Sequence, residues 1–431
     1  MKKVTYPRLD EQLYWGKLEN GLTVAVLPRP GFSRKLAYFV TDYGAMHTGF
    51  TFEGQHYIAP AGIAHFLEHK MFDMPGGRDV TAEFAALGAS TNAFTSYDLT
   101  AYYVACTENF RECLKILLEF VSTPCFSPES VEKELGIIDQ EIGMSLDAPD
   151  SRVFEDLMDN LFHSHPIRVP ILGNCETIRQ ITPEWLNLCH RAFYAPGNMM
   201  LCVVGDVDPD EVKALALEVL GSENRPVGKK DPFPREEMTA RVSSACRAME
   251  VAMPMFSMAF KAEALENGPE GVRQEMVADL AAEALFGESS ALYLKLYEEG
   301  LIDSSFGGGF EAVDDCAMLV ISGDSEDPEA VRDAIVAEAA RLAAAGIDEN
   351  WFGRMKRSAL GRRIRALDSF DSTCFRICAY HYSGFDYFAF PEVYEKIQAP
   401  EIQAFLARVV TRERCSLAII TPLEEEVEHE Q

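Results

Sequence analysis

Two histidines and a glutamate lie within five consecutive residues, His65-Phe66-Leu67-Glu68-His69. The apolar residues around them predict a helix over residues 61–72. Residues four apart on a helix differ by about 40° around its axis, so the rings of His65 and His69 project from one face. Two imidazoles on adjacent turns can share one zinc ion at about 2.0–2.1 Å. Glu68 lies beside the same face, placed to act as a general base on a water molecule rather than to bind the metal.

This H-x-x-E-H pattern is the reverse of the H-E-x-x-H motif. With nine histidines in 431 residues, chance would produce it on the order of 2% of the time, so the bare pattern is only suggestive. The alternative is a partly exposed helix that carries two histidines. The apolar neighbours weigh against that alternative, because buried ionisable groups are costly unless they are paired or bound to a metal.

A zinc ion with a catalytic water needs a third protein ligand. The long helix predicted from Ser127 to about Ser145 offers Glu132, Glu134 and Glu141. Glu134 and Glu141 are seven residues apart, so they face the same way to within about 20°. One can bind the metal while the other hydrogen-bonds a ligand or the base, and the spacing leaves open which does which. Without the histidine motif, a solvated acidic face would be the favoured interpretation.

The elements that must position these residues alternate between strand and helix signals. The first half predicts strands at 22–27, 35–41, 90–94, 100–106 and 199–204, and helices at 61–72, 80–87, 109–121, 127–145, 151–162, 183–193 and 208–220. The second half predicts strands at 248–253, 258–261, 305–310, 317–322 and 415–420, and helices at 270–285, 289–299, 327–345, 349–368 and 400–410.

This repeated order predicts an α+β fold of two similar units, each a mixed sheet covered by helices. The stretch from Gly221 to Thr239 has three prolines, two glycines and many charges, which predicts a linker over residues 223–239. We therefore expect a metal-binding domain over residues 1–222 and a second domain, without the motif, over residues 240–431.

The composition narrows the partners and the compartment. The net charge is −29, from 39 Lys+Arg against 68 Asp+Glu, which disfavours nucleic acid and anionic membranes as partners. No signal peptide and no transmembrane run are predicted. Eleven cysteines without a paired pattern predict reduced thiols in a cytoplasmic protein. Cys374 and Cys378, one helical turn apart, are interpreted as packing thiols rather than as a metal site.

Four blocks of sequence carry a family resemblance: GIAHFLEHKMF, GASTNAFTSYDLTAYYV, VEKELGIIDQEI and HPIRVPILG. They resemble the pitrilysin/insulinase family of inverted-motif zinc peptidases, and the likeness covers nearly the whole chain. The segments FLEHKMF and FGESSALYLKLYEEGLID are similar to those of the motif-bearing member of the bacterial two-subunit branch. The resemblance implies His65, His69 and Glu141 as zinc ligands, Glu68 as the base and Glu134 as its support. It also implies two α+β units that face each other across a cavity.

The resemblance gives the predicted strand near residue 90 a role in substrate binding. An edge strand bearing Asn92 and Ala93 would line the cleft, where a peptide could pair with it through backbone hydrogen bonds. Phe94 is a candidate pocket residue, and ordinary core packing is an equally good interpretation of it.

One part of the family pattern is missing. Self-sufficient members carry an Arg and a Tyr in the second unit that help to hold the substrate and the oxyanion. Those positions are occupied here by Tyr297 and Asp303. Because a lost oxyanion donor is typically worth about 10²–10³ in rate, we expect a partner chain to supply that half of the site, or the chain alone to be a weak enzyme.

The sequence therefore predicts a cytoplasmic zinc endopeptidase that cuts short or unfolded peptides, with a homologous partner subunit. Two alternatives stay open: a peptide-binding subunit with structural zinc, and a protease dedicated to maturing one peptide. Residues 306–310 (FGGGF) lack the lysine of a phosphate loop, and the basic run 362–365 is interpreted as a solvated helix face. His163 and His165 are interpreted as turn residues rather than as additional metal ligands.

Overall fold

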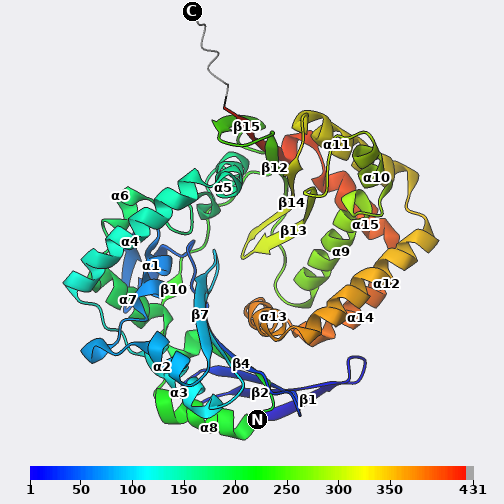
Figure 1. Ribbon diagram of the computed structural model, residues 1–431. Coiled ribbons are helices and arrows are strands. Elements are labelled where there is room, and N and C mark those ends of the chain that lie inside the picture. The colour runs from blue at the N-terminus through cyan, green and yellow to red at the C-terminus, as the bar shows by residue number, and fades with distance from the viewer. Residues whose placement is uncertain (424–431) are drawn as a thin grey trace, which may run out of the picture. The chain divides into compact units, whose positions relative to one another are not determined.

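The computed structural model describes residues 1–423 of the chain. The chain forms two compact units (Figure 1). The first contains residues 1–142, 170–232 and 363–389, and the second contains residues 143–169, 233–362 and those from Phe390 onward. Each unit combines a mixed sheet with helices, as the sequence predicted.

The first unit is built on a seven-stranded sheet in the order β1-β2-β3-β9-β4-β8-β7, with a small three-stranded sheet β10-β5-β6. Its strands are β1 (Lys2–Tyr6), β2 (Glu11–Lys17), β3 (Thr23–Pro28), β4 (Lys35–Thr41), β5 (Gly49–Phe52), β6 (Gln55–Ile58), β7 (Ser90–Thr95), β8 (Thr100–Cys106), β9 (Met199–Gly205) and β10 (Lys229–Lys230). Its helices are α1 (Ile63–Lys70), α2 (Val80–Ala86), α3 (Phe110–Ser122), most of α4 (Pro128–Asp147), α6 (Cys175–Ile178), α7 (Pro183–Phe193), α8 (Pro209–Leu220) and α13 (Phe370–Tyr382).

The second unit is built on a five-stranded sheet in the order β11-β15-β12-β14-β13. Its strands are β11 (Ser244–Met249), β12 (Met255–Ala262), β13 (Gly307–Val313), β14 (Cys316–Asp324) and β15 (Cys415–Pro422). Its helices are α5 (Pro149–Leu161), α9 (Pro269–Phe286), α10 (Ala291–Glu298), α11 (Pro328–Ala345), most of α12 (Glu349–Arg365), α14 (Phe390–Lys396) and α15 (Ala399–Val409).

The two sheets share one strand pattern. In the first unit β3 runs parallel to β9, and β9, β4, β8 and β7 then follow with antiparallel pairing. In the second unit β11 runs parallel to β15, and β15, β12, β14 and β13 follow in the same antiparallel order. The predicted repetition of one α+β unit is therefore confirmed at the level of topology, and β7 and β13 are the matching edge strands.

The central strands of the first sheet are apolar on both faces. All seven residues of β9 are buried. Leu201 and Val203 belong to a core that also contains Leu114 and Leu117 of α3, whereas the alternating residue Cys202 faces α13, where Cys374 donates a hydrogen bond to its carbonyl. Two-sided burial requires helices on both faces, and α13 covers the second face although it lies far along the chain.

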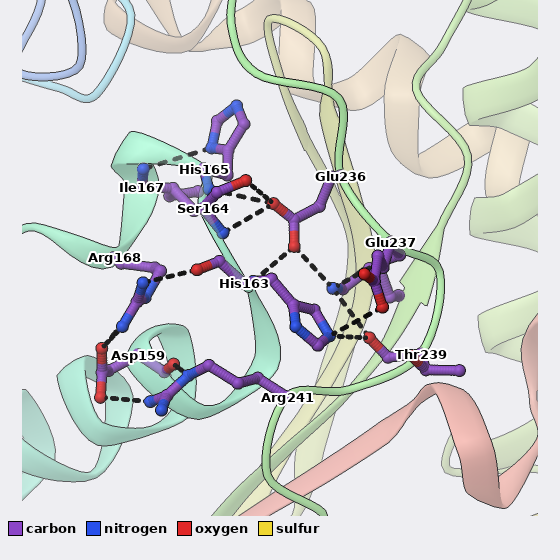
Figure 2. A network of polar contacts seen from close by, with 11 residues as sticks. Asp159, His163, Ser164, His165, Ile167, Arg168, Glu236, Glu237, Thr239 and Arg241 are labelled. Carbon is purple, nitrogen blue, oxygen red and sulfur yellow. Dashed lines mark hydrogen bonds and ion pairs between the residues drawn. The ribbon is translucent and has the colours of Figure 1, made fainter.

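Helix α5 plays the corresponding part in the second unit, where it packs on β12 and β15. The segment that follows α5 is fastened by a polar network (Figure 2). The Glu236 carboxylate accepts hydrogen bonds from the backbone N–H groups of His163, Ser164 and His165. It also forms an ion pair with the ammonium of Lys261. These contacts fix residues 163–165 in the second unit.

The compact units cut across the division at 223–239 that the sequence suggested. Residues 143–169 belong to the second unit and residues 363–389 to the first, because α5 and α13 each cover a sheet face formed by distant strands. The expected linker contributes to both units: β10 pairs with β5 in the first, and Glu236 is held in the second.

The secondary-structure prediction needs correction at several elements. The strands β1, β2, β5, β6 and β10 and the helices α6, α13 and α14 were not predicted. Most of them are too short to show a period, whereas the helical spacing of Phe370, Cys374 and Ile377 in α13 was present and was overlooked. The strand expected at 248–253 is β11, which ends at Met249; the loop that follows leads to Pro254. Among residues 1–423, no helix has both the length and the apolar character to cross a membrane.

Candidate metal centre

The helix α1, which carries the histidine motif, begins at a glycine that its surroundings require. Gly62 precedes the helix with φ of 89°, a left-handed conformation that only glycine adopts without strain. A Cβ at Gly62 would lie 2.4 Å from the carbonyl oxygen of Leu172. Ile63, Phe66 and Leu67 are buried in the core of the first unit, which leaves His65 and His69 on the other face of α1.

The structure brings together the side chains of His65, His69 and Glu141. Their ligand atoms all lie within 4.8 Å of one another. The Nε2 atoms of His65 and His69 are each 3.7 Å from a carboxylate oxygen of Glu141 on α4. Three ligand atoms that share a tetrahedral zinc ion at about 2.0–2.1 Å would lie roughly 3.4 Å apart. The observed donor set therefore needs only small side-chain movements to hold such an ion.

Glu134 lies on the other side of His69. Its Oε1 is 3.0 Å from Nδ1 of His69, and its Oε2 is 3.5 Å from Nζ of Lys70. A hydrogen bond between Nδ1–H and this carboxylate leaves Nε2 of His69 as the lone-pair donor for a metal. The geometry thus separates two glutamates that the helical spacing had left equivalent, with Glu141 facing both Nε2 atoms and Glu134 facing Nδ1.

The pKa shifts of the two histidines act on metal binding in opposite directions. Burial, followed by the neighbouring charge of His69, lowers the pKa of His65 to about 4, so this imidazole is neutral at physiological pH. Burial opposes ionisation of Glu134, but the hydrogen bond from His69 and the charge of Lys70 outweigh it and lower the pKa of Glu134. Neutral imidazoles are the forms that bind zinc, so the lowered pKa of His65 favours binding. The hydrogen bond to Glu134 outweighs burial and raises the pKa of His69, which favours the protonated ring and opposes binding.

Glu68 lies close to this group, and β7 holds its carboxylate. The hydroxyl of Thr95 donates a hydrogen bond of 2.8 Å to Oε2 of Glu68. Burial raises the pKa of Glu68, while the Thr95 hydrogen bond and the charge of His69 act in the opposite direction. A carboxylate whose pKa is raised toward neutrality is suited to take up and release a proton.

Asn92, Ala93 and Phe94 lie on β7, which is an edge of the seven-stranded sheet. At the turn between β7 and β8, the backbone N–H of Ser96 donates a hydrogen bond to the carbonyl of Leu99, so it points toward β8. The backbone N–H groups of successive residues in an antiparallel edge strand point alternately toward the neighbouring strand and toward the open edge. The N–H of Ala93 therefore points to the open edge, where it donates a hydrogen bond of 2.9 Å to the side-chain oxygen of Asn92. The ring of Phe94 is partly buried and lies 6.0 Å from that of Phe375 on α13.

Several other sequence candidates belong to the second unit. Tyr297 is 53% exposed on α10 and stacks on Tyr293, and Asp303 accepts hydrogen bonds from Ser305; both belong to the second unit. His163 and His165 take part in the hydrogen bonds around Glu236 and Asp315. Within residues 1–423, His65, His69 and Glu141 form the one group of three or more metal-binding side chains close enough to share an ion.

Comparison with known proteins identifies the family. The family model of insulinase (peptidase family M16) matches residues 47–174, and the model of the peptidase M16 inactive domain matches residues 180–359. The uncharacterized zinc protease YmfH of Bacillus subtilis is 34% identical over 430 residues, which cover 98% of this chain and 99% of YmfH. The chain belongs to the M16 peptidase family. The pitrilysin/insulinase resemblance is thereby confirmed.

Solved M16 structures agree with the fold. An M16-like peptidase from Alicyclobacillus acidocaldarius superposes with a TM-score of 0.92 at 32% identity, covering 96% of this chain and 99% of that one. Pitrilysin superposes with a TM-score of 0.78 at 16% identity over 97% of this chain, which spans 46% of the pitrilysin chain. The pitrilysin match shows the fold alone, and it places this M16 chain at about half the length of that protein.

Two residues of the centre were not singled out in the sequence. Thr95, at the end of β7, contacts Glu68, and Lys70, directly after His69, contacts Glu134. A lysine next to His69, between the apolar residues Leu67 and Met71, was the available signal for Lys70. Thr95 gave no local signal, because its contact with Glu68 depends on how β7 lies beside α1.

Proposed function

We propose that this chain is a zinc-dependent endopeptidase that hydrolyses short or unfolded peptides together with a homologous partner subunit. The observation that carries the proposal is the convergence of His65, His69 and Glu141 on one point, with Glu68 beside them in a position held by Thr95. The M16 family membership, and the description of YmfH as a zinc protease, support zinc as the metal.

The residues of the first unit would divide the work as follows. His65, His69 and Glu141 would hold the zinc ion, which when bound polarises the scissile carbonyl and lowers the pKa of the attacking water. Glu68 would take a proton from that water at its carboxylate and pass it to the leaving amine. Glu134 would hold the His69 ring through Nδ1.

The open edge of β7 would bind the peptide backbone. The outward N–H of Ala93 is bonded to the side chain of Asn92, so a substrate carbonyl could take the place of that amide oxygen. Such strand addition recognises the backbone rather than a particular sequence. Phe94 lies on the same strand and would contribute to side-chain selection.

The test of the chemistry compares wild type with Glu68→Gln and a matched control, Glu132→Gln, which changes an exposed glutamate of α4. Glu68→Gln should keep its zinc and lose peptide cleavage by at least about 10²-fold. Glu132→Gln should keep both. Unchanged cleavage by Glu68→Gln would refute its role as the base, and a wild-type chain that binds no zinc would refute the proposal.

The partner subunit is proposed because Tyr297 and Asp303 stand where self-sufficient relatives are expected to carry Arg and Tyr. The chain alone should cut slowly, and addition of the native partner should raise the rate by about 10²–10³ if it supplies the oxyanion donors. Robust proteolysis by the purified single chain would refute this part.

The same two positions favour one alternative, a peptide-binding subunit in which zinc stabilises the fold. Co-purification of the native complex, followed by zinc analysis and a peptide-cleavage assay, separates the two. A zinc-loaded complex that binds peptides and cuts none would establish the alternative.

A further inference from the structure

Lys70 is a charged residue in the core of the first unit. It directly follows His69 on α1, and its side chain is 2% exposed. Its ammonium contacts the carboxylate of Asp73, the backbone carbonyl of Ser130 at 3.2 Å and Oε2 of Glu134 at 3.5 Å. The neighbouring residues Leu67 and Met71 are buried and apolar.

Stability alone does not account for a lysine at this position. Removing an ammonium from water is costly, and an apolar side chain of similar volume is often at least as stabilising as a buried ion pair. A buried lysine that persists among apolar neighbours is therefore a candidate for a specific task, and its contacts indicate which task that is.

The ammonium of Lys70 joins the two helices that carry the metal-binding side chains. His65 and His69 come from α1 and Glu141 comes from α4. Lys70 also belongs to α1, and it contacts α4 at both Ser130 and Glu134, which lie one turn apart. This bridge lies two turns before Glu141 along α4.

The same ammonium orients the carboxylate of Glu134. One oxygen of Glu134 faces Nδ1 of His69 at 3.0 Å, and the other faces Lys70. With one oxygen held by Lys70, the other stays directed at the His69 ring. A ligand histidine held through its second nitrogen has a fixed tautomer and a fixed ring orientation.

We propose that Lys70 is a positioning residue of the metal centre, which acts through Glu134 on His69. The inference rests on the proposed zinc site and extends it to a residue that does not touch the metal. Its consequence is that the charge of Lys70 contributes to zinc affinity as well as to packing.

The test measures zinc affinity by competition with a chromophoric chelator, on the full chain, for wild type, Lys70→Met and Glu134→Gln and for the double variant. Lys133→Met is the matched control, because Lys133 is exposed and adjacent to Glu134 in sequence. Lys70→Met should bind zinc about 10-fold or more weakly, and Lys133→Met should stay within about twofold of wild type. In the Glu134→Gln background, Lys70→Met should cause little further loss, since both changes break the same chain of contacts.

Thermal unfolding of the metal-free proteins shows whether Lys70→Met still folds. If it does not, Lys70→Gln takes its place, since it removes the charge but keeps N–H donors for Ser130 and Asp73, and the same results are expected. Wild-type affinity in the Lys70 variants, or an equal loss with and without Glu134, would overturn the inference. A wild-type chain that binds no zinc would instead refute the proposed function.

Discussion

The network around Glu236 gives a stability prediction that does not involve the metal (Figure 2). The carboxylate accepts N–H bonds from the backbone of Ser164 and His165 at 3.0 Å each and from that of His163, and the Lys261 ammonium lies 3.2 Å away. Burial alone would raise the pKa of Glu236, but these donors outweigh it and lower the pKa from 4.5 to about 2. Replacing the carboxylate by an amide should therefore destabilise the second unit.

The size of the effect follows from that pKa. A fall from 4.5 to about 2 corresponds to roughly 3 kcal/mol of stability in favour of the ionised form. The side chain of Glu236 is 14% exposed, and screening by solvent reduces the figure, so we expect about 2 kcal/mol for Glu236→Gln at pH 7. Because the folded-state pKa is depressed, this stabilisation is present above pH 4.5 and is lost as the pH falls toward 2.

The assay is hydrogen exchange of the segment that contains His163, Ser164 and His165, read by mass spectrometry. A loss of about 2 kcal/mol should speed exchange of these amides roughly 30-fold at pH 7. Glu237→Gln is the matched control, since its side chain is 74% exposed and lies 3.9 Å from His163, and it should change exchange little. Zinc content should be unaffected by either substitution, because both residues lie in the second unit.

Two results would contradict this reasoning. Exchange in Glu236→Gln that is accelerated less than about threefold would show that the three N–H bonds do not depend on the charge. Equal acceleration in Glu237→Gln would show that any loss of negative charge in this loop has the same effect. In urea unfolding, the stability difference between wild type and Glu236→Gln should also shrink between pH 5 and pH 3.5, to about 60% of its neutral value; a constant difference would contradict the assigned pKa.

Two further predictions concern the site and the thiols. Thr95→Val removes the hydroxyl that holds Glu68 while keeping the side-chain shape, so kcat for peptide cleavage should fall about 10-fold with zinc content unchanged; an unchanged kcat would show that Glu68 needs no such support. Cys246 is exposed, Cys125 and Cys175 are partly exposed, and the other eight cysteines are buried. A thiol reagent should therefore modify Cys246 first in the folded protein, and Cys246→Ser should remove that fast phase; several fast thiols would contradict the burial of the remainder.

Much of the metal centre followed from local sequence. The four-residue spacing of His65 and His69, and the seven-residue spacing of Glu134 and Glu141, fix which side chains share a helix face, because helical periodicity is a property of a few consecutive residues. The observed helices α1 and α4 lie within a few residues of their predicted bounds. The strand β7 was also expected from its pattern, and its position at the sheet edge was expected from the resemblance to a known family.

The choice between the two glutamates required the tertiary structure. Spacing made Glu134 and Glu141 equivalent, and only the way α4 lies beside α1 places Glu141 at both Nε2 atoms and Glu134 at Nδ1. The contacts of Lys70 and Thr95 were hidden for the same reason, since each joins residues that are far apart in the chain.

The assignment of helices to the two units also could not be predicted from local sequence. The apolar run at residues 199–204 predicted a strand, but the local sequence does not determine which helix covers each of its faces. On one face that helix proved to be α13, more than 160 residues later, and α5 covers the second sheet in return. The sequence by itself determined most of the longer elements, the histidine motif and the family pattern, because these depend on short-range periodicity and residue type. The tertiary structure decided which helix covers which sheet and which carboxylate meets which nitrogen, because long-range packing selects among partners that local patterns leave equivalent.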